Sequence, residues 1–84
     1  MIEKHGKGTE YHNNGRIKFE GNYQNGEKNG KGSEYNEYGN LIYEGEYLNG
    51  KKWNGKVKEY NYEGELIFEG EYLNGEKKRK GKGN

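Results

Sequence analysis

Internal repetition is the feature of this sequence that most restricts its fold. Three segments of equal length, 21 residues each, align with one another: GKGTEYHNNGRIKFEGNYQNG (6–26), GKGSEYNEYGNLIYEGEYLNG (30–50) and GKVKEYNYEGELIFEGEYLNG (55–75). Repetition with a period of this order is typical of arrays in which each unit packs against its neighbours. The chain is therefore expected to fold as a single repeat domain rather than as several independent ones.

Only the spacers between these segments differ in length. Length variation is typical of exposed loops, so the sequence predicts loops at 27–29, 51–54 and 76–80. We expect one domain, 1–84, whose units are 6–29, 30–54 and 55–80, with a partial fourth unit at 81–84.

Apolar residues recur at every second position inside each segment. Ile17, Phe19, Gly21 and Tyr23 alternate with polar residues, a period that indicates a half-buried β-strand. This alternation and the density of glycine argue against helix. The predicted core is a ladder of rings along one face of a sheet: Phe19, Tyr23, Tyr43, Tyr47, Phe68 and Tyr72.

Asn-Gly dipeptides stand beside the strand-like runs. They occur at 14–15, 25–26, 29–30, 49–50, 54–55 and 74–75. Both residues tolerate positive φ, which makes Asn-Gly the strongest short-range signal for a β-hairpin. Each unit is therefore predicted to be a hairpin with a short first strand, such as Lys31 to Tyr35, a turn around Gly39 and a longer second strand.

A glycine lies between two aromatic residues in each second strand. Glycine weakens a strand unless a neighbour covers its bare backbone, and an aromatic ring can do so. We expect ring-covered sockets at Gly21, Gly45 and Gly70. Paired glycines in the first strands, such as Gly30 and Gly32, would let the sheet bend. A glycine-rich linker is the alternative, but turn chemistry and strand period agree on an ordered sheet.

The pattern Phe/Tyr-Glu-Gly-x-Tyr-x-Asn-Gly, followed by Gly-Lys-Gly, resembles the MORN repeat. Tyr43, Gly45, Tyr47, Gly50 and Gly55 occupy the matching places in one unit, and the resemblance covers Gly6 to Gly83. This sequence has tyrosine at the second aromatic position, where the family often has tryptophan. The interval from Gly39 to Tyr43 is also one residue longer than in the commonest MORN unit. It is similar to a variant of bacterial repeat proteins, some of them labelled antitoxins.

The resemblance implies an all-β fold, an open, single-layer, curved antiparallel sheet of stacked β-hairpins with aromatic residues along one face. It also implies non-catalytic repeats that serve as scaffolds, dimerisation arms or grooves for partners. Some family members are linked to acidic phospholipids. Protein association is therefore the first functional hypothesis, binding of acidic phospholipid (phosphoinositide) at a membrane surface the second, and a regulatory antitoxin-like partner the third.

Aromatic residues outside the ladder are candidates for a protein interface. Tyr11, Tyr35 and Tyr60 hold the same place in each first strand, where a concave aromatic row can accept an apolar helix or peptide. The alternative is that these rings only cover glycines and each other. Trp53 is predicted in a spacer loop outside the ladder, either as a packing plug or as an interface anchor. Open sheet edges offer a second route to self-association, which charged edge residues would oppose.

Basic residues gather near the C-terminus. A cluster of this kind can hold the phosphates of lipid or nucleic acid, although a solvated tail is the alternative. The formal net charge is only +1, and nothing in the pattern predicts sequence-specific DNA binding. The candidate contacts to anionic lipid are Lys77, Lys78, Arg79, Lys80 and Lys82.

Residues for catalysis or metal binding are scarce. The sequence has neither cysteine nor aspartate, and His5 and His12 are its only imidazoles, so a thiolate metal site or a triad cannot be assembled. Glu10, Glu34 and Glu59 form a repeated row, but repeat symmetry gives them like surroundings, whereas acid–base catalysis needs different ones. Surface solubility and pairing with lysine across strands explain these glutamates better. We expect no enzymatic activity and no cofactor.

No apolar run is long enough for a signal peptide or a membrane span. The expected location is therefore the cytoplasm, with any membrane contact at its periphery.

Overall fold

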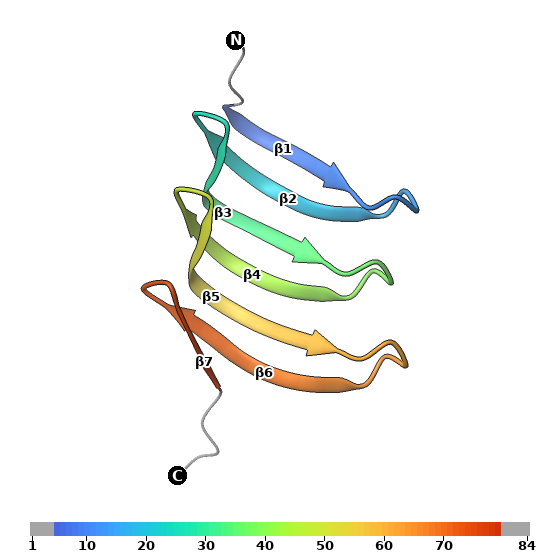
Figure 1. Cartoon of the computed structure of the whole chain (residues 1–84). Coiled ribbons are helices and arrows are strands. Elements are labelled where there is room, and N and C mark those ends of the chain that lie inside the picture. Colours follow the sequence, from blue (N-terminus) through green and yellow to red (C-terminus); the bar gives the residue numbers. More distant parts are fainter. Residues whose placement is uncertain (1–4, 80–84) are drawn as a thin grey trace.

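The computed structural model describes residues 5–79, which form one antiparallel sheet of seven strands. Neighbours in the sheet are neighbours in the chain, from β1 at one edge to β7 at the other (Figure 1). The principal extents are 48 × 31 × 13 Å, and the smallest leaves room for one layer only. These findings confirm the predicted all-β, open, single-layer sheet. The strands are β1 (Gly6–Tyr11), β2 (Ile17–Gln24), β3 (Glu27–Tyr35), β4 (Leu41–Leu48), β5 (Lys51–Tyr60), β6 (Leu66–Leu73) and β7 (Glu76–Arg79).

The predictions made for residues 80–84, including the partial fourth unit at 81–84, lie outside the described residues. Residues 5–79 contain no helix with the length and apolar character needed to cross a membrane.

Two kinds of connection alternate along the chain, at opposite ends of the strands (Figure 1). Two-residue Asn-Gly turns, 25–26, 49–50 and 74–75, have positive φ at both residues, as the right-handed strand twist requires of a tight hairpin. Five-residue loops join the other ends at 12–16, 36–40 and 61–65. All three loops carry the same pair of backbone hydrogen bonds, which in the first are His12 N to Arg16 O (2.8 Å) and Gly15 N to His12 O (2.9 Å).

The Asn-Gly pairs at 29–30 and 54–55 are not turns, so the hairpin prediction is wrong at these two places. Both pairs lie inside strands, β3 and β5. The Asn29 Oδ1 accepts a hydrogen bond from the backbone N of Asn49 (3.1 Å), and the Asn54 Oδ1 accepts one from the backbone N of Asn74 (2.9 Å). These asparagines dock the turn of one hairpin onto the preceding unit.

The spacers 27–29 and 51–54, and the described part of the third, 76–79, lie in strands, so the prediction of exposed loops there is wrong. The chain pairs back at once after each two-residue turn, beginning with Gln24 opposite Glu27. β3 therefore starts at Glu27 instead of Lys31, and the unit boundaries predicted at 29/30 and 54/55 fall inside β3 and β5. The pairing register shifts within β2/β3, between Gly21 and Tyr23, and within β4/β5, between Glu46 and Tyr47.

A row of glycines crosses five adjacent strands, and the strands bend sharply there. The ring centroids of Phe19 and Tyr23 are 5.5 Å apart, although four residues of extended strand span about 13 Å. Tyr43 and Tyr47 show the same approach, at 5.2 Å. The sheet thus folds along the row into a trough with the rings inside. The aligned glycines are Gly8, Gly21, Gly32, Gly45 and Gly55.

The core consists of rings that meet edge to face across unit boundaries. Phe19 contacts Tyr47 with a centroid distance of 5.3 Å, and Tyr43 contacts Tyr72 at 5.8 Å. This geometry favours aromatic pairs beyond the area that they bury. The buried side chains are Phe19, Tyr23, Tyr43, Tyr47 and Val57, with the partly buried Phe68 and Tyr72 packed against them.

Candidate interaction surfaces

Lysine side chains lie over the rings of the trough. The Lys28 Nζ is 4.4 Å from the centroid of Phe19, and the Lys52 Nζ is 5.3 Å from that of Tyr43. A cation at this distance is attracted to the face of the ring. Phe19 and Tyr43 are themselves 0% exposed. The ring face is therefore a closed, lysine-covered surface rather than an open aromatic groove.

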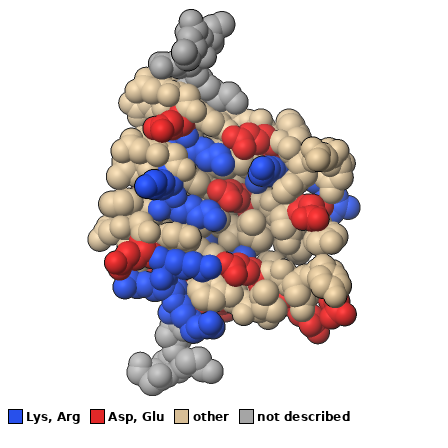
Figure 2. Space-filling model, viewed as in Figure 1, with Lys and Arg blue, Asp and Glu red and all other residues tan. Residues whose placement is uncertain are grey.

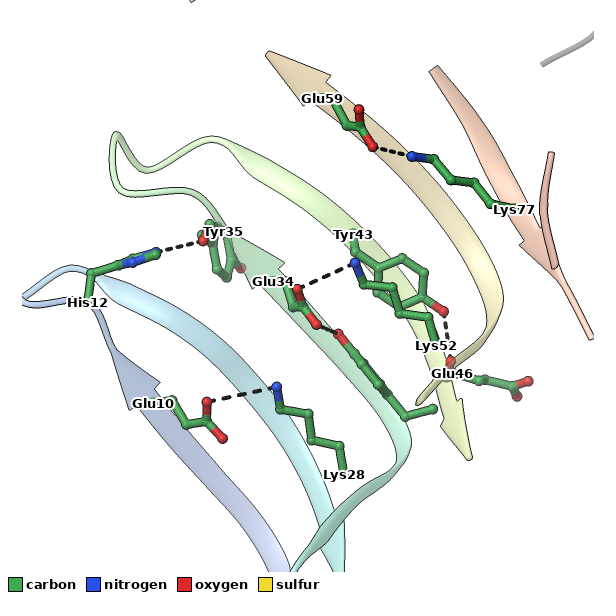
Figure 3. Close-up of polar contacts among 11 residues, drawn as sticks. Glu10, His12, Lys28, Glu34, Tyr35, Tyr43, Glu46, Lys52, Glu59 and Lys77 are labelled. Atoms are coloured by element: carbon green, nitrogen blue, oxygen red, sulfur yellow. Dashed lines mark hydrogen bonds and ion pairs between the residues drawn. The ribbon is translucent and has the colours of Figure 1, made fainter. Parts of the chain in front are cut away.

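Both of these lysines, and Lys77 in the third unit, also face a glutamate from two strands away (Figure 3). The Nζ–Oε distances are 3.8 Å for Lys28 and Glu10, 3.7 Å for Lys52 and Glu34, and 2.5 Å for Lys77 and Glu59. The lysine follows its glutamate by eighteen residues in every unit. Lysine partners for these glutamates were predicted from the sequence, but the particular lysines were not. Their constant spacing was the signal that could have found them.

Buried tyrosine hydroxyls complete this arrangement. The Tyr47 hydroxyl donates to the Glu34 Oε2 (2.6 Å), and the Tyr23 hydroxyl donates to the Glu10 Oε2. Burial raises the pKa of Tyr47 and of Tyr23, and the hydrogen bond to the glutamate raises each further. Both hydroxyls therefore stay protonated as donors at neutral pH. This face of the sheet carries hydrogen-bonded carboxylates in like surroundings, which hold the units together.

The predicted socket glycines differ in what lies over them. A Cβ at Gly21 would meet the Phe19 ring at 2.8 Å, and one at Gly70 would meet the Phe68 ring at 2.9 Å. At Gly45 the nearest atoms belong instead to the backbone of Asn54 and Gly55 on the neighbouring strand. Close approach of two backbones, as well as ring cover, therefore requires glycine at these three positions.

Trp53 lies inside β5, so the prediction that it stands in a spacer loop is wrong. Its ring lies 3.1 Å from the place that a Cβ on Gly75 would occupy, and its carbonyl accepts a hydrogen bond from Gly75 N (2.9 Å). Burial raises the pKa of Tyr43, and a hydrogen bond with the Trp53 backbone partly opposes that rise. The Trp53 ring thus packs against the turn at 74–75, beside a hollow of about 360 Å³, while its backbone contacts the Tyr43 hydroxyl.

The other predicted interface tyrosines end the first strand of each unit. Tyr11 is 62% exposed, whereas Tyr35 and Tyr60 are half-buried. The Tyr35 carbonyl lies 2.8 Å from the His12 Nε2, a contact that ties the first loop to β3 (Figure 3). Tyr11 is therefore the most accessible of the three.

Large apolar side chains are exposed more often than they are buried in the described part of the chain: nine are exposed and five form the core. Seven of the nine lie in or next to the five-residue loops, along one edge of the molecule. Most of them were not predicted as interface residues because they stand in or beside predicted turns, where an aromatic residue such as Tyr38 is itself an unusual choice. We call this set the loop edge: Tyr11, Ile17, Tyr38, Leu41, Tyr62, Leu66 and Ile67.

The basic residues of β7 are exposed but partly matched by carboxylates. Lys77 pairs with Glu59 and Lys78 with Glu76 (3.3 Å), while the Arg79 guanidinium lies 5.0 Å from the Phe68 centroid. The hydrogen bond to Glu59 raises the pKa of Lys77. Figure 2 shows basic side chains densest next to the C-terminal end, with acidic ones interleaved over the rest of this face. Lys80 and Lys82, the remaining predicted lipid contacts, lie outside the described residues.

The face opposite the rings carries a hollow of about 700 Å³. It lies over the glycine row, with charged walls that include Lys7, Lys31, Glu20 and Glu44. Within residues 5–79 no group of three or more His, Cys, Asp or Glu side chains is placed to hold a metal ion.

Comparisons with protein-family models, with curated proteins and with solved structures gave no match.

Proposed function

We propose that this chain is a non-catalytic, MORN-like repeat module that associates with protein through its loop edge. The observation that carries the proposal is that seven of the nine exposed large apolar side chains among the described residues lie on the loop edge, whereas only five such side chains form the core. Within the described residues no second layer of secondary structure covers either face of the sheet. Contiguous exposed apolar residues of this kind mark interaction sites.

Two of the three loops of the loop edge are also tied together before any partner arrives. The Asn14 Nδ2 donates to the Glu37 carbonyl (2.8 Å), and the Arg16 Nη1 donates to the Tyr38 carbonyl (2.6 Å). These bonds tie the first loop to the second, so little loop ordering remains to oppose binding. The ring face is less suited, because a partner would first have to displace the lysines from their glutamates.

Site-specific photo-crosslinking tests this proposal. A photoreactive phenylalanine replaces Tyr38 on the loop edge or, as the matched control, Lys31 on the opposite face. We expect a discrete protein adduct from position 38, identified by mass spectrometry, and none from position 31. Leu41→Ser with Leu66→Ser in the same chain should abolish the adduct. Adducts of equal yield from both positions, or none from position 38, contradict the proposal.

Vesicle sedimentation examines the lipid hypothesis on the same protein. Neutral vesicles and vesicles containing phosphoinositide are compared across a salt series, for the intact chain and for one that ends at Gly75. Salt-sensitive binding that is lost on truncation, together with no adduct from position 38, would replace protein association with membrane-surface binding. A regulatory partner of the antitoxin type would be recognised from the identity of the cross-linked protein.

A further inference from the structure

Charge changes sign along the loop edge from the first unit to the third. Equivalent loop positions carry Arg16, Asn40 and Glu65. Lys18 adds a second positive charge beside the first loop, and Glu63 adds a second negative charge in the third. None of these four charged side chains has an ion pair with another described residue. The loop edge is therefore apolar along its length, basic at one end and acidic at the other.

The two ends are far enough apart to act as separate contacts. Successive loops are two strands apart, and strands are spaced by about 4.8 Å, so the first and third loops are separated by about 19 Å. That distance exceeds the Debye length of about 8 Å at physiological ionic strength. The charge at each end thus acts on whatever faces it, almost independently of the other end.

An edge with this pattern is complementary to itself when one copy is turned by a twofold axis. The basic first loop of one copy then faces the acidic third loop of the other, twice in each pair. Tyr38 and Leu41 of the two copies meet at the centre. A parallel arrangement would bring like charges together at both ends, which is unfavourable.

We propose that the occupant of the loop edge is a second copy of this chain, bound antiparallel about a twofold axis beside the middle loop. This inference rests on the proposed function and names its partner. The apolar residues provide the buried centre of the interface, and the opposite charges at the two ends set its direction. Glu37 is the one unfavourable element, because both copies bring this carboxylate near the axis.

A charge-swap experiment with the purified chain tests the direction of pairing. The acidic variant carries Arg16→Glu with Lys18→Glu, and the basic variant carries Glu63→Lys with Glu65→Lys. Sedimentation velocity over a concentration series at low and at high salt should show a dimer of the natural chain that weakens with salt. Each variant alone should dimerise at least roughly tenfold more weakly. An equimolar mixture should recover the dimer, because both contacts between the two variants again join opposite charges.

Single substitutions keep the test valid if a double variant does not fold. The side chains of Lys18 and Glu63 make no hydrogen bond or ion pair with the described residues, so Lys18→Glu and Glu63→Lys should fold and show the same effect in weaker form. Circular dichroism confirms that each variant is folded. Glu37→Gln should tighten the dimer, since it removes the repulsion near the axis.

A natural chain that stays monomeric at all concentrations overturns this inference. So does a dimer that the mixture fails to restore, or one that Glu37→Gln weakens. These results are distinguishable from failure of the proposed function. A monomeric chain that still gives a cross-linked adduct of another protein from position 38 retains protein association with a different partner, whereas no adduct at all removes both.

Discussion

Replacing Gly21 with alanine tests whether the glycine row sets the bend of the sheet. Gly21 does not have a left-handed φ, so alanine adds no conformational strain of its own there. Its Cβ, however, would lie 2.5 Å from the Gly32 Cα and 2.7 Å from the Lys31 carbonyl oxygen. Non-bonded carbons prefer about 3.5 to 4.0 Å. β2 and β3 would therefore have to separate by about 1 Å at the bend.

The expected loss of stability follows from three contributions. Overpacking in a tight site costs about 1 to 3 kcal/mol, and each weakened ladder hydrogen bond costs about 1 kcal/mol. Alanine also lowers the conformational entropy of the unfolded chain, which stabilises the folded state by about 0.4 to 1 kcal/mol. The net expectation for Gly21→Ala is a loss of about 2 to 3 kcal/mol in the free energy of unfolding, a large share of the stability of so small a domain.

Urea denaturation followed by far-ultraviolet circular dichroism measures this loss. Gly26→Ala is the matched control, because Gly26 has φ of 81° and nothing within 4 Å of an added Cβ. Its cost comes from the backbone conformation alone and should be about 1 to 2 kcal/mol. A Gly21→Ala variant as stable as the natural chain, or more stable than Gly26→Ala, would refute the account of the bend.

Three further predictions concern the hydrogen-bonded carboxylates of the ring face. Tyr47→Phe removes the hydrogen-bond donor to Glu34. It should lower the free energy of unfolding, measured by urea titration, by about 1.5 to 3 kcal/mol. The control Tyr62→Phe, at a side chain 83% exposed, should leave the free energy of unfolding unchanged. Burial and the hydrogen bond raise the pKa of Tyr47 above its unfolded value of 10.0, so the folded state holds this proton more tightly. The resulting stabilisation is fully present below pH 10 and declines as the pH rises above it; a series of urea titrations across that range should show a shallower decline in Tyr47→Phe. Lys52→Met removes a partly exposed ion pair and should cost less than about 1 kcal/mol; a loss larger than that of Tyr47→Phe would show that the lysine dominates.

The strands and the ring ladder were predictable from the sequence because both depend on local pattern. Alternation with period two fixes which side chains share a face, and it placed Phe19 and Tyr23 together on the ring face. The same rule identified Gly21 as a place where backbone must be bare. Resemblance to a known repeat added the open single layer, which local pattern does not specify.

Identical Asn-Gly dipeptides adopt different structures, and the sequence did not distinguish which of them form turns. Asn25-Gly26 forms a tight turn, whereas Asn29-Gly30 lies within a strand and its asparagine accepts a hydrogen bond from Asn49. The difference arises because the Asn29 side chain faces the turn of the next hairpin. That neighbour exists only once the hairpins have stacked.

The candidate sites were predictable only in part, for a related reason. The sequence identified Tyr11 and the aromatic ladder as candidate contacts. It did not identify the lysines that cover the rings, because each pairs with a glutamate eighteen positions earlier and two strands away. Such a contact depends on pairing register and on the bend at the glycine row. The loop edge likewise becomes one surface only when three loops, each unremarkable in sequence, are stacked at the same end of the sheet.

The sequence by itself determined the hairpin repeat, the face that holds the rings and the glycines that allow the bend, because these follow from side-chain alternation and from the backbone freedom of particular residues. Only the tertiary structure decided which Asn-Gly pairs form turns and that lysine side chains cover the rings. It also brought the exposed apolar residues of three loops to one edge, with basic residues at the first loop and acidic residues at the third. Those features depend on stacking distances between units, which no single segment of the chain specifies.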